Sequence, residues 1–244
     1  MYPQYLTIDF HSHVLPGMDD GSQNSDMSVE MLRRMGQQGI HIVAATPHFY
    51  GYREGVDSFL QRRAARWGRL NQKWKDNLPR VVLGAEVACF SGMLELDGLE
   101  QLCYQGTNTL LLELPFAQWT ETELDIVSTL CLDRGYRVIL AHFERYIGVQ
   151  KNKYIAARLQ ELPVWIQINA GSLLPWTRRG KCINMFLENR AHLLGSDSHN
   201  LADRRPNLNQ AREMLEKKAG DQVLRQIDIC GMDLLGLFPA EVME

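Results

Sequence analysis

Apolar and polar positions alternate in blocks along the whole chain. Seven short runs rich in apolar or β-branched residues lie at residues 5–10, 40–46, 81–86, 109–113, 137–142, 164–169 and 192–196. Most of the segments between them have the apolar spacing of helices. Strands that alternate with helices predict a parallel sheet. Seven such units in 244 residues predict a single α/β domain, residues 1–244, closed or nearly closed into a TIM-like barrel.

The helix expected at residues 27–38 has signals at both ends. Ser25 or Asp26 can accept hydrogen bonds from the free N–H groups of its first turn. Gly39 lies where this helix has to stop before the next strand, because glycine readily adopts the left-handed conformation common at helix ends.

A second helix, expected at residues 121–134, begins with a capping box. Thr120 and Glu123 have the Thr-x-x-Glu spacing in which each side chain satisfies a backbone N–H group of the first turn. Gly135 follows as the expected stop signal.

A third helix, expected at residues 57–75, separates apolar from basic residues. Its apolar stripe consists of Leu60, Trp67 and Trp74. Its basic face consists of Arg62, Arg66, Arg69 and Lys73. We interpret this face as solvated. The alternative is a contact with an acidic partner or a neighbouring subunit, so a homo-oligomer stays open.

Composition excludes several classes of protein. The formal charge of −3 and the pI near 6.2 give no overall attraction to nucleic acid or to an anionic membrane. The sequence has no run of 18 apolar residues, and its first residues lack the basic start and apolar stretch of a signal peptide. We therefore expect a soluble, cytoplasmic protein that binds no nucleic acid and does not insert into a membrane.

Five widely spaced cysteines include no Cys-x-x-Cys pair, which argues against a disulfide framework and a zinc ribbon. Cys131 and Arg137 do have the Cys-x5-Arg spacing of thiol phosphatases. That chemistry needs a phosphate-cradling loop, whereas Cys131 falls inside the helix expected at residues 121–134. We interpret the match as coincidence.

Ionisable and polar residues gather where the predicted strands end. The residues at these ends are His11, His13, His48, Glu86, Glu113, His142, Asn169, Asp197 and His199. In a parallel barrel the carboxyl ends of all strands lie at one rim, so side chains from different strands converge there. Residues two apart in a strand point the same way, so His11 and His13 can present both imidazoles to one ion.

So many histidines and carboxylates would be unstable together without counter-ions, because burial and like charges penalise each group. Divalent cations would remove that penalty. Imidazole and carboxylate ligands without thiolate suit zinc, iron or manganese. The number of ligands predicts more than one ion.

Single residues differ in how strongly their context supports a metal ligand. Glu113 lies in an apolar run, where an unpaired carboxylate is rare, so we favour a ligand. Asp20 lies in the turn Pro-Gly-Met-Asp-Asp-Gly and suits turn chemistry nearly as well. His41 and His192 begin strands, at the opposite rim, and we expect both to be structural.

Two arginines lie just beyond ligand positions. Arg145 follows His142, and Arg204 follows His199. A guanidinium group can bind a phosphate through two hydrogen bonds, so we favour phosphate binding, with surface ion pairs as the alternative.

Taken together, these motifs resemble the polymerase and histidinol phosphatase (PHP) superfamily in order and spacing. The motifs are Asp9-Phe-His11-Ser-His13 with Asp20-Gly, Ala45-Thr-Pro-His48, Gly84-Ala-Glu86, His142-x-Glu-Arg145, Asn169-Ala-Gly-Ser172 and Ser196-Asp-Ser-His199-Asn200. Within the superfamily the chain is most similar to the bacterial manganese-dependent protein-tyrosine phosphatases of capsule and exopolysaccharide synthesis. The resemblance extends from about residue 6 to about residue 215.

The resemblance implies a distorted (β/α)7 barrel that holds three divalent ions, expected to be Mn²⁺, with Fe or Zn as alternatives. The implied ligands are His11, His13, Glu86 and Asp197 for the first ion, a bridging Glu86 with Glu113 and His142 for the second, and Asp20, His48 and His199 for the third.

The implied activity is hydrolysis of phosphotyrosine. A metal-activated hydroxide can attack phosphorus in line with the leaving oxygen, without a phosphoenzyme. Arg145 and Arg204 match the phosphate-binding arginines of the family and would neutralise the phosphoryl oxygens during catalysis. Asn169 and Asn200 are further expected substrate contacts. A phenolate leaving group, with a pKa of about 10, needs less protonation than an alkoxide, which favours aryl phosphates.

Two departures from the family pattern leave the substrate preference open. Phe143 replaces a proline that is frequent in the family, and the segment 49–52 has the sequence Phe-Tyr-Gly-Tyr. Tyr50, Tyr52 and Trp176 can wall a bound aryl ring, although we favour the interpretation that they are ordinary loop aromatics.

Three alternatives remain open. A phosphatase of histidinol phosphate or another small phosphomonoester would use the same barrel and ions. An amidohydrolase shares His-x-His and a late aspartate, but it usually depends on a carboxylated lysine where this chain offers Glu86. A non-catalytic scaffold that binds a phosphorylated tail would have lost ligands, and none is missing. The partner implied by the resemblance is a phosphotyrosine protein, such as the tail of a bacterial tyrosine kinase.

Overall fold

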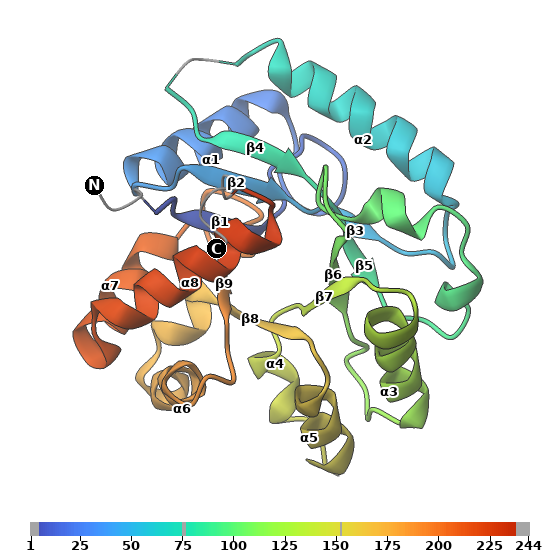
Figure 1. The fold of residues 1–244 in the computed structure, drawn as a ribbon. Coiled ribbons are helices and arrows are strands. Elements are labelled where there is room, and N and C mark those ends of the chain that lie inside the picture. The colour runs from blue at the N-terminus through green and yellow to red at the C-terminus, as the bar shows by residue number, and fades with distance from the viewer. Residues whose placement is uncertain (1–4, 75–76, 152, 238–244) are drawn as a thin grey trace.

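Parallel strands form a curled sheet at the centre of the molecule, and helices pack outside the curve (Figure 1). The computed structural model describes residues 5–74, 77–151 and 153–237. The strands are β1 (Ile8–Ser12), β2 (Ile42–Ala45), β3 (His48–Phe49), β4 (Arg80–Leu83), β5 (Glu86–Ala88), β6 (Thr109–Glu113), β7 (Arg137–Leu140), β8 (Trp165–Asn169) and β9 (Leu193–Gly195).

The curled sheet consists of two hydrogen-bonded parts, a three-stranded one with the order β1-β2-β4 and a six-stranded one with the order β3-β5-β6-β7-β8-β9. Pro47 lies between β2 and β3, and residues 84–85 lie between β4 and β5, so two of the seven predicted strands bend. Backbone hydrogen bonds continue across the bend, from Gly84 N–H to the Ala45 carbonyl at 2.9 Å and from Glu86 N–H to the Pro47 carbonyl at 3.0 Å. The seven predicted strand positions are therefore confirmed.

The first and last strands, β1 and β9, meet near their carboxyl ends. Ser12 and Ser198 form a parallel bridge, and the His13 N–H group donates to the Ser198 carbonyl at 2.9 Å. The buried carboxylate of Asp9 accepts a hydrogen bond from the Ser196 N–H group at 2.8 Å. The ends that carry the candidate ligands are thus held together directly.

Helices cover the outer face of the sheet. They are α1 (Ser25–Gln37), α2 (Val56–Asn71), α3 (Glu121–Ser128), α4 (Glu144–Ile147), α5 (Lys153–Glu161), α6 (Trp176–Leu187), α7 (Leu208–Ala219) and α8 (Asp221–Leu234). Outward-facing strand side chains pack against them and form the main apolar cluster. None of the helices in the described part of the chain is long and apolar enough to cross a membrane.

Inward-facing side chains form a second apolar cluster, and α8 covers one end of it (Figure 1). Phe10 of β1 packs there with Met232 and Leu234 of α8. Thr109, the first residue of β6, donates its hydroxyl to the Leu234 carbonyl at 2.7 Å. A Cβ atom on Gly231 would lie 2.6 Å from the Phe10 ring, so glycine permits this close approach. Helix α8 therefore closes the amino ends of the strands, opposite the candidate site.

The expected capping residue of α1 was wrong. Asn24 caps the helix, and its side chain accepts a hydrogen bond from the Met27 N–H group at 3.0 Å. Ser25 and Asp26 lie one and two positions later, inside the first turn. Gly39 has the expected left-handed conformation, with φ of 78°.

The capping box before α3 is confirmed, with both of its hydrogen bonds formed by Thr120 and Glu123. The regular helix is shorter than expected, because residues 129–133 wind as a π-helical turn before Gly135. Cys131 lies in that turn, and burial raises its pKa. The structure therefore gives this thiol none of the loop geometry of a thiol phosphatase.

The four basic residues predicted along residues 57–75 are exposed or half-exposed, as a solvated face requires. The helix ends at Asn71, before the expected residue 75. Two of the predicted basic residues form ion pairs within the chain. Arg62 forms an ion pair with Glu54, and Lys73 forms one with Asp26. Both ion pairs are partly exposed, and they partly neutralise the charge available to a partner.

Candidate metal centre and phosphate-binding site

All nine ligands predicted from the sequence lie together at the carboxyl ends of the strands. Their donor atoms form overlapping groups with all distances within 4.8 Å, namely His13-Asp20-His48-His199, His11-Glu86-His142, His11-His13-Asp197 and His48-Glu86-Glu113. Most of these side chains are buried, whereas Asp20 is 65% exposed. The cluster is therefore a buried centre with one acidic group at its mouth.

The end of β1 supplies two imidazoles to the first group. The Nε2 atoms of His11 and His13 lie 3.1 Å apart, and they lie 3.1 and 3.3 Å from Oε2 of Glu86. Oδ1 of Asp197 lies 3.7 and 3.6 Å from the same two nitrogens. Donor atoms about 2.1 Å from one ion lie about 3.0 to 3.4 Å apart. The four side chains are thus spaced much like the ligands of a single ion.

Glu86 connects this group to a second one. Its Oε1 lies 2.8 Å from Nε2 of His142, whereas its Oε2 makes the contacts with His11 and His13. Nε2 of His142 also lies 3.5 Å from Oε1 of Glu113. A carboxylate with one oxygen toward each group has the arrangement of a ligand that bridges two ions.

The third group gathers around Asp20. Its Oδ1 lies 3.5 Å from Nε2 of His48 and 3.4 Å from Nε2 of His199. These residues come from the turn after β1, from the start of β3 and from the loop after β9. Segments far apart in the sequence therefore meet at one point.

Buried polar atoms without a hydrogen-bond partner are concentrated in this cluster. Among the described residues, four of the seven such side-chain atoms belong to ligand candidates, namely His48 Nδ1, Glu86 Oε2, His142 Nδ1 and His199 Nε2. The first two lie 2.9 Å apart, so they face each other without a hydrogen bond of ordinary geometry. Buried polar atoms are rarely left without a partner, since each costs about 1 to 3 kcal/mol. Nitrogen and oxygen donors without sulfur suit Mn²⁺, Fe²⁺ or Zn²⁺. The residues present thus fit bound divalent ions.

The pKa values show how strongly the charges of the cluster interact. Burial would lower the pKa of His13, but Asp19 and Glu86 outweigh it and raise the pKa to about 10. Burial would raise the pKa of Glu86, but His11 and the other histidines hold it well below its ordinary value. Burial and the neighbouring His13 lower the pKa of His199 to about 4. Divalent ions would replace these protons, since metal ligands must be deprotonated.

Two ligands have strained backbones. His142 has φ of 32° and Asp197 has φ of 51°, and only Asn189 joins them as a non-glycine residue with positive φ among the described residues. Such conformations cost about 1 to 3 kcal/mol each and persist where the surroundings enforce them, often at functional sites.

Both predicted phosphate-binding arginines lie at the edge of the cluster, beside Asp197. Arg204 donates from Nη2 to Oδ1 of Asp197 at 2.7 Å, and its Nη1 lies 3.7 Å from Asp20. Nη1 of Arg145 lies 3.6 Å from Oδ2 of Asp197. Both side chains are 40% exposed, so their guanidinium groups can reach a ligand from solvent.

Comparison with known proteins identifies the family. Residues 7–232 match the family described as "Capsular polysaccharide synthesis, CpsB/CapC". The chain belongs to the CpsB/CapC family. It is 32% identical over 225 residues to the tyrosine-protein phosphatase YwqE of Bacillus subtilis (strain 168), covering 88% of this chain and 86% of that protein. It is 27% identical over 233 residues to the tyrosine-protein phosphatase CpsB of Streptococcus agalactiae serotype V, covering 91% and 95%.

A solved structure shares the fold of this CpsB/CapC chain. It is described as "Crystal structures of YwqE from Bacillus subtilis and CpsB from Streptococcus pneumoniae, unique metal-dependent tyrosine phosphatases", and it aligns with a TM-score of 0.81 and 27% identity over 96% of each chain. A dihydropyrimidinase from Brevibacillus agri aligns with a TM-score of 0.57 and 12% identity over 96% of this chain and 71% of that chain, which shows a shared fold alone.

Two residues that orient ligands in this CpsB/CapC chain were missed by the sequence analysis. Asp19 accepts a hydrogen bond from Nδ1 of His13 at 2.7 Å. The other ring nitrogen of His13, Nε2, faces Glu86 and the rest of the cluster. Oε1 of Gln167 lies 3.2 Å from Nδ1 of His11. Such partners fix the orientation of a ligating imidazole. The pair Asp19-Asp20 carried a signal for the first residue, but Gln167 lies in an apolar run and carried none.

The predicted substrate asparagines make contacts inside the chain. Asn169 donates to Oδ2 of Asp197 at 2.8 Å and accepts from Gln167 at 2.9 Å. Oδ1 of Asn200 accepts from the N–H groups of Ala202 and Arg204 at 2.9 and 3.1 Å. Asn200 therefore shapes the loop that presents Arg204. Direct contacts of either asparagine with substrate stay predictions.

The aromatic residues singled out in the sequence separate into different environments. Phe143 is fully buried and packs on Trp119, so its side chain belongs to the core. Tyr50 stacks on His48 with ring centroids 5.3 Å apart, at the edge of the cluster, and Tyr52 packs on it at 5.7 Å. Trp176 is 83% exposed at the start of α6.

Proposed function

We propose that this chain is a metal-dependent protein-tyrosine phosphatase. The observation that carries the proposal is the position of two arginines beside a mostly buried cluster of nine metal-ligand candidates, several of whose donor atoms have no hydrogen-bond partner. Cations and guanidinium groups at one point suit a phosphoryl group, whose charge is spread over several oxygens. The names of the related YwqE and CpsB proteins support the same activity.

The proposal includes the finer arrangement expected from the sequence. We infer a single domain with a distorted (β/α)7 barrel, three ions, and the ligand sets given above, with Glu86 as the bridge. Mn²⁺ is the expected metal, with Fe or Zn as alternatives. The bridge between β1 and the segment after β9, the overlapping donor groups and the two-sided contacts of Glu86 support this arrangement.

The residues of the chain divide the work of hydrolysis. Bound ions would act as Lewis acids and lower the pKa of a coordinated water. Arg145 and Arg204 would hold the phosphoryl oxygens and neutralise their charge in the transition state. Tyr50, stacked beside the cluster, would contact the aryl ring of the substrate. A phenolate leaves with little help from an acid, so a dedicated proton donor is not required.

The substrate in this proposal is a phosphotyrosine protein, and the tail of a bacterial tyrosine kinase is the expected example. A cytoplasmic location and a homo-oligomeric state stay predictions from the sequence. Among the alternatives, hydrolysis of histidinol phosphate or another small phosphomonoester would use the same cluster. The amidohydrolase and scaffold hypotheses have no specific observation in their favour.

Hydrolysis of a phosphotyrosine peptide by chelator-stripped protein, with and without added Mn²⁺, tests the function. We expect activity to return with Mn²⁺ in the native chain and to stay absent in His13→Ala, while the control His41→Ala recovers like the native chain. Histidinol phosphate, assayed in parallel, separates the two phosphatase hypotheses. Absence of phosphotyrosine turnover in protein shown to contain metal would overturn the proposal.

A further inference from the structure

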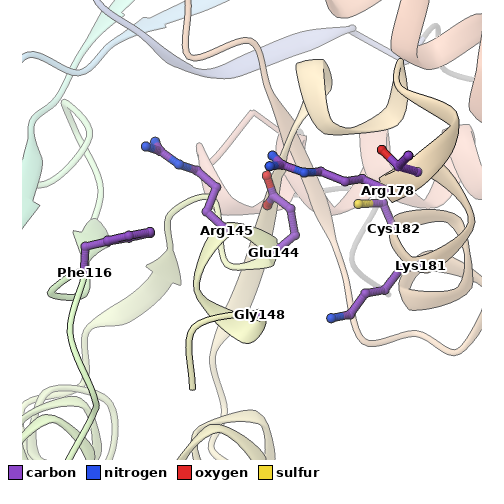
Figure 2. Close-up of a pocket in the computed structure, with 8 residues that line it drawn as sticks. Phe116, Glu144, Arg145, Gly148, Arg178, Lys181 and Cys182 are labelled. Carbon is purple, nitrogen blue, oxygen red and sulfur yellow. The ribbon is translucent and has the colours of Figure 1, made fainter. Parts of the chain in front are cut away.

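A cavity of about 440 Å³ lies beside the candidate active site (Figure 2). It lies between the segment after β6, the short helix α4 and the first turns of α6. Its lining residues are Phe116, Glu144, Arg145, Gly148, Thr177, Arg178, Lys181 and Cys182. None of the nine metal-ligand candidates lines it, so it is distinct from the cluster.

This cavity shares two of its lining residues with the cavity at the phosphate-binding site. Arg145 and Arg178 also line a neighbouring cavity of about 370 Å³, whose walls include Asp197 and Arg204. A polypeptide bound with its phosphotyrosine at the cluster would therefore pass along a wall shared by both cavities. Successive residues of an extended peptide advance by about 3.3 to 3.6 Å, so a near neighbour of the phosphotyrosine can reach the second cavity.

The charge of the cavity is positive. Arg178 and Lys181 extend from α6 toward α4, are exposed, and form no ion pair within the described residues (Figure 2). Arg145 adds a third cation, and the first turn of α6 contains no acidic residue. The one carboxylate in the lining, Glu144, accepts a hydrogen bond from the Ser172 hydroxyl at 2.7 Å. Arg178 and Lys181 thus lie beside one carboxylate that is already hydrogen-bonded, while Arg145 is shared with Asp197.

An aromatic edge connects the cavity to the metal-ligand candidates. Phe116 is 66% exposed, and its ring lies 5.6 Å from that of Tyr146. The Tyr146 ring in turn lies 5.3 Å from the imidazole of His142. The exposed Phe116 ring offers an apolar surface on which a polypeptide can pack between the cluster and the cations.

We propose that Arg178 and Lys181 bind an acidic side chain that lies close to the phosphotyrosine in the polypeptide substrate. The chemistry they recognise is an anionic group, which a carboxylate or a second phosphate can supply. This inference rests on the proposed function and extends it from the phosphoryl group to the sequence around it. It makes α6 a determinant of substrate choice that acts mainly on binding.

A panel of phosphotyrosine peptides tests the inference on the Mn²⁺-loaded full chain. Glutamate, phosphoserine, alanine or lysine is placed at each of the three positions before and after the phosphotyrosine. We expect at least one position where glutamate raises kcat/KM about tenfold over alanine, mainly through KM, because a charged hydrogen bond contributes that much. Phosphoserine at the same position shows whether a carboxylate or a phosphate binds better. Equal rates for all peptides would overturn the inference.

Charge reversal on α6 gives the sharper result. The double variant Arg178→Glu with Lys181→Glu should reverse the preference from glutamate to lysine peptides. Because Arg178 also lines the phosphate-binding cavity, hydrolysis of para-nitrophenyl phosphate should fall as well, but by less than hydrolysis of the glutamate peptide. The control Lys217→Glu with Lys218→Glu, in the last turn of α7, makes the same charge change at exposed positions and should keep the native preference. A shift of equal size in the control would show a general effect of net charge and contradict the inference.

A binding measurement separates this inference from the proposed function. Fluorescence anisotropy with a labelled peptide that carries a non-hydrolysable phosphotyrosine analogue measures affinity without turnover. We expect the glutamate peptide to bind about tenfold more tightly than the alanine peptide, and the difference to shrink at high salt. Selective binding without turnover would refute only the phosphatase function, whereas turnover without selectivity would refute only the role of α6.

Discussion

The two ends of the sheet use histidine in different ways. At the amino ends, Nδ1 of His41 accepts a hydrogen bond from the Thr7 N–H group, and Nδ1 of His192 accepts one from the Ile166 N–H group, each at 3.0 Å. At the carboxyl ends, five histidines instead face carboxylates and one another. Histidine side chains thus complete the backbone hydrogen bonding at one end of the sheet and form a candidate metal centre at the other.

The difference follows from what else lies at each end. At the amino ends, α8 closes the interior with apolar side chains such as Met232. The polar groups that require a hydrogen-bond partner there are mainly backbone N–H groups. At the carboxyl ends, loops of different strands bring charged groups together without such a cover. A histidine near a strand therefore gains its role from the end at which it lies and from the neighbours there.

The largest effect is expected from Glu86→Gln, because Glu86 contacts four of the five histidines of the cluster. An amide cannot bridge two cations as a carboxylate does. We expect loss of bound metal and a fall in kcat/KM of more than about a hundredfold. Mass spectrometry of the bound metal and phosphotyrosine turnover measure both. His41→Gln, at the opposite end, is the matched control, and an unchanged metal content in Glu86→Gln would contradict the bridging role.

A smaller effect is expected from Asp19→Asn, which keeps the shape of the partner of His13 but removes its charge. Loss of such a partner typically lowers metal affinity or activity by about ten- to a hundredfold. Titration of metal-free protein with Mn²⁺ measures the change in affinity. Asp26→Asn, on the surface of α1, is the control. Native affinity in Asp19→Asn would show that the charge of Asp19 does not support His13 as a ligand.

Arg204→Ala tests whether the arginines serve the substrate and not the ligands. We expect kcat/KM to fall about ten- to a hundredfold while the metal content stays native, because the charge that neutralises the phosphoryl oxygens is lost. Arg33→Ala on α1 is the control for removal of a paired surface arginine. Loss of metal in Arg204→Ala would instead show that its contact with Asp197 holds a ligand in place.

The smallest effect is expected at the amino ends. Burial lowers the pKa of His192 below its ordinary value of 6.5, so the unfolded chain takes up this proton at a higher pH than the folded chain. The contribution of neutral His192 to stability is therefore complete above pH 6.5 and decreases as the pH falls below it. His192→Asn should lose about 1 kcal/mol at neutral pH and less in acid.

Urea unfolding of the native chain and of His192→Asn at two pH values measures this difference, with phosphotyrosine turnover unchanged. A difference in stability that grows on acidification would contradict the assignment of a half-buried, neutral imidazole. Loss of bound metal in this variant would contradict the separation between the two ends.

Much of the candidate site could be predicted because its residues lie at strand ends. Short apolar or β-branched runs located the strands, and parallel strands place their carboxyl ends at one rim, so eight of the nine ligands could be named without any contact information. The ninth, Asp20, lies in a turn and was implied by the family resemblance. The contact of Gln167 with His11 could not be predicted in this way, because the residues around Gln167 have the composition of an ordinary buried strand. The cap of α1 could not be predicted either, because Asn24, Ser25 and Asp26 are all competent capping residues and only the backbone path selects one.

The sequence by itself determined the order of strands and helices, the chemistry of the donor atoms and the rim at which they meet. These properties depend on the local pattern of apolar residues and on the right-handed crossover that connects parallel strands. Only the tertiary structure decided which neighbour several side chains contact: Asp19 and not Asp20 lies against His13, Gln167 lies against His11, and Arg178 and Lys181 lie beside the phosphate-binding arginines. Such contacts depend on side-chain directions across segments far apart in the chain, which no local pattern encodes.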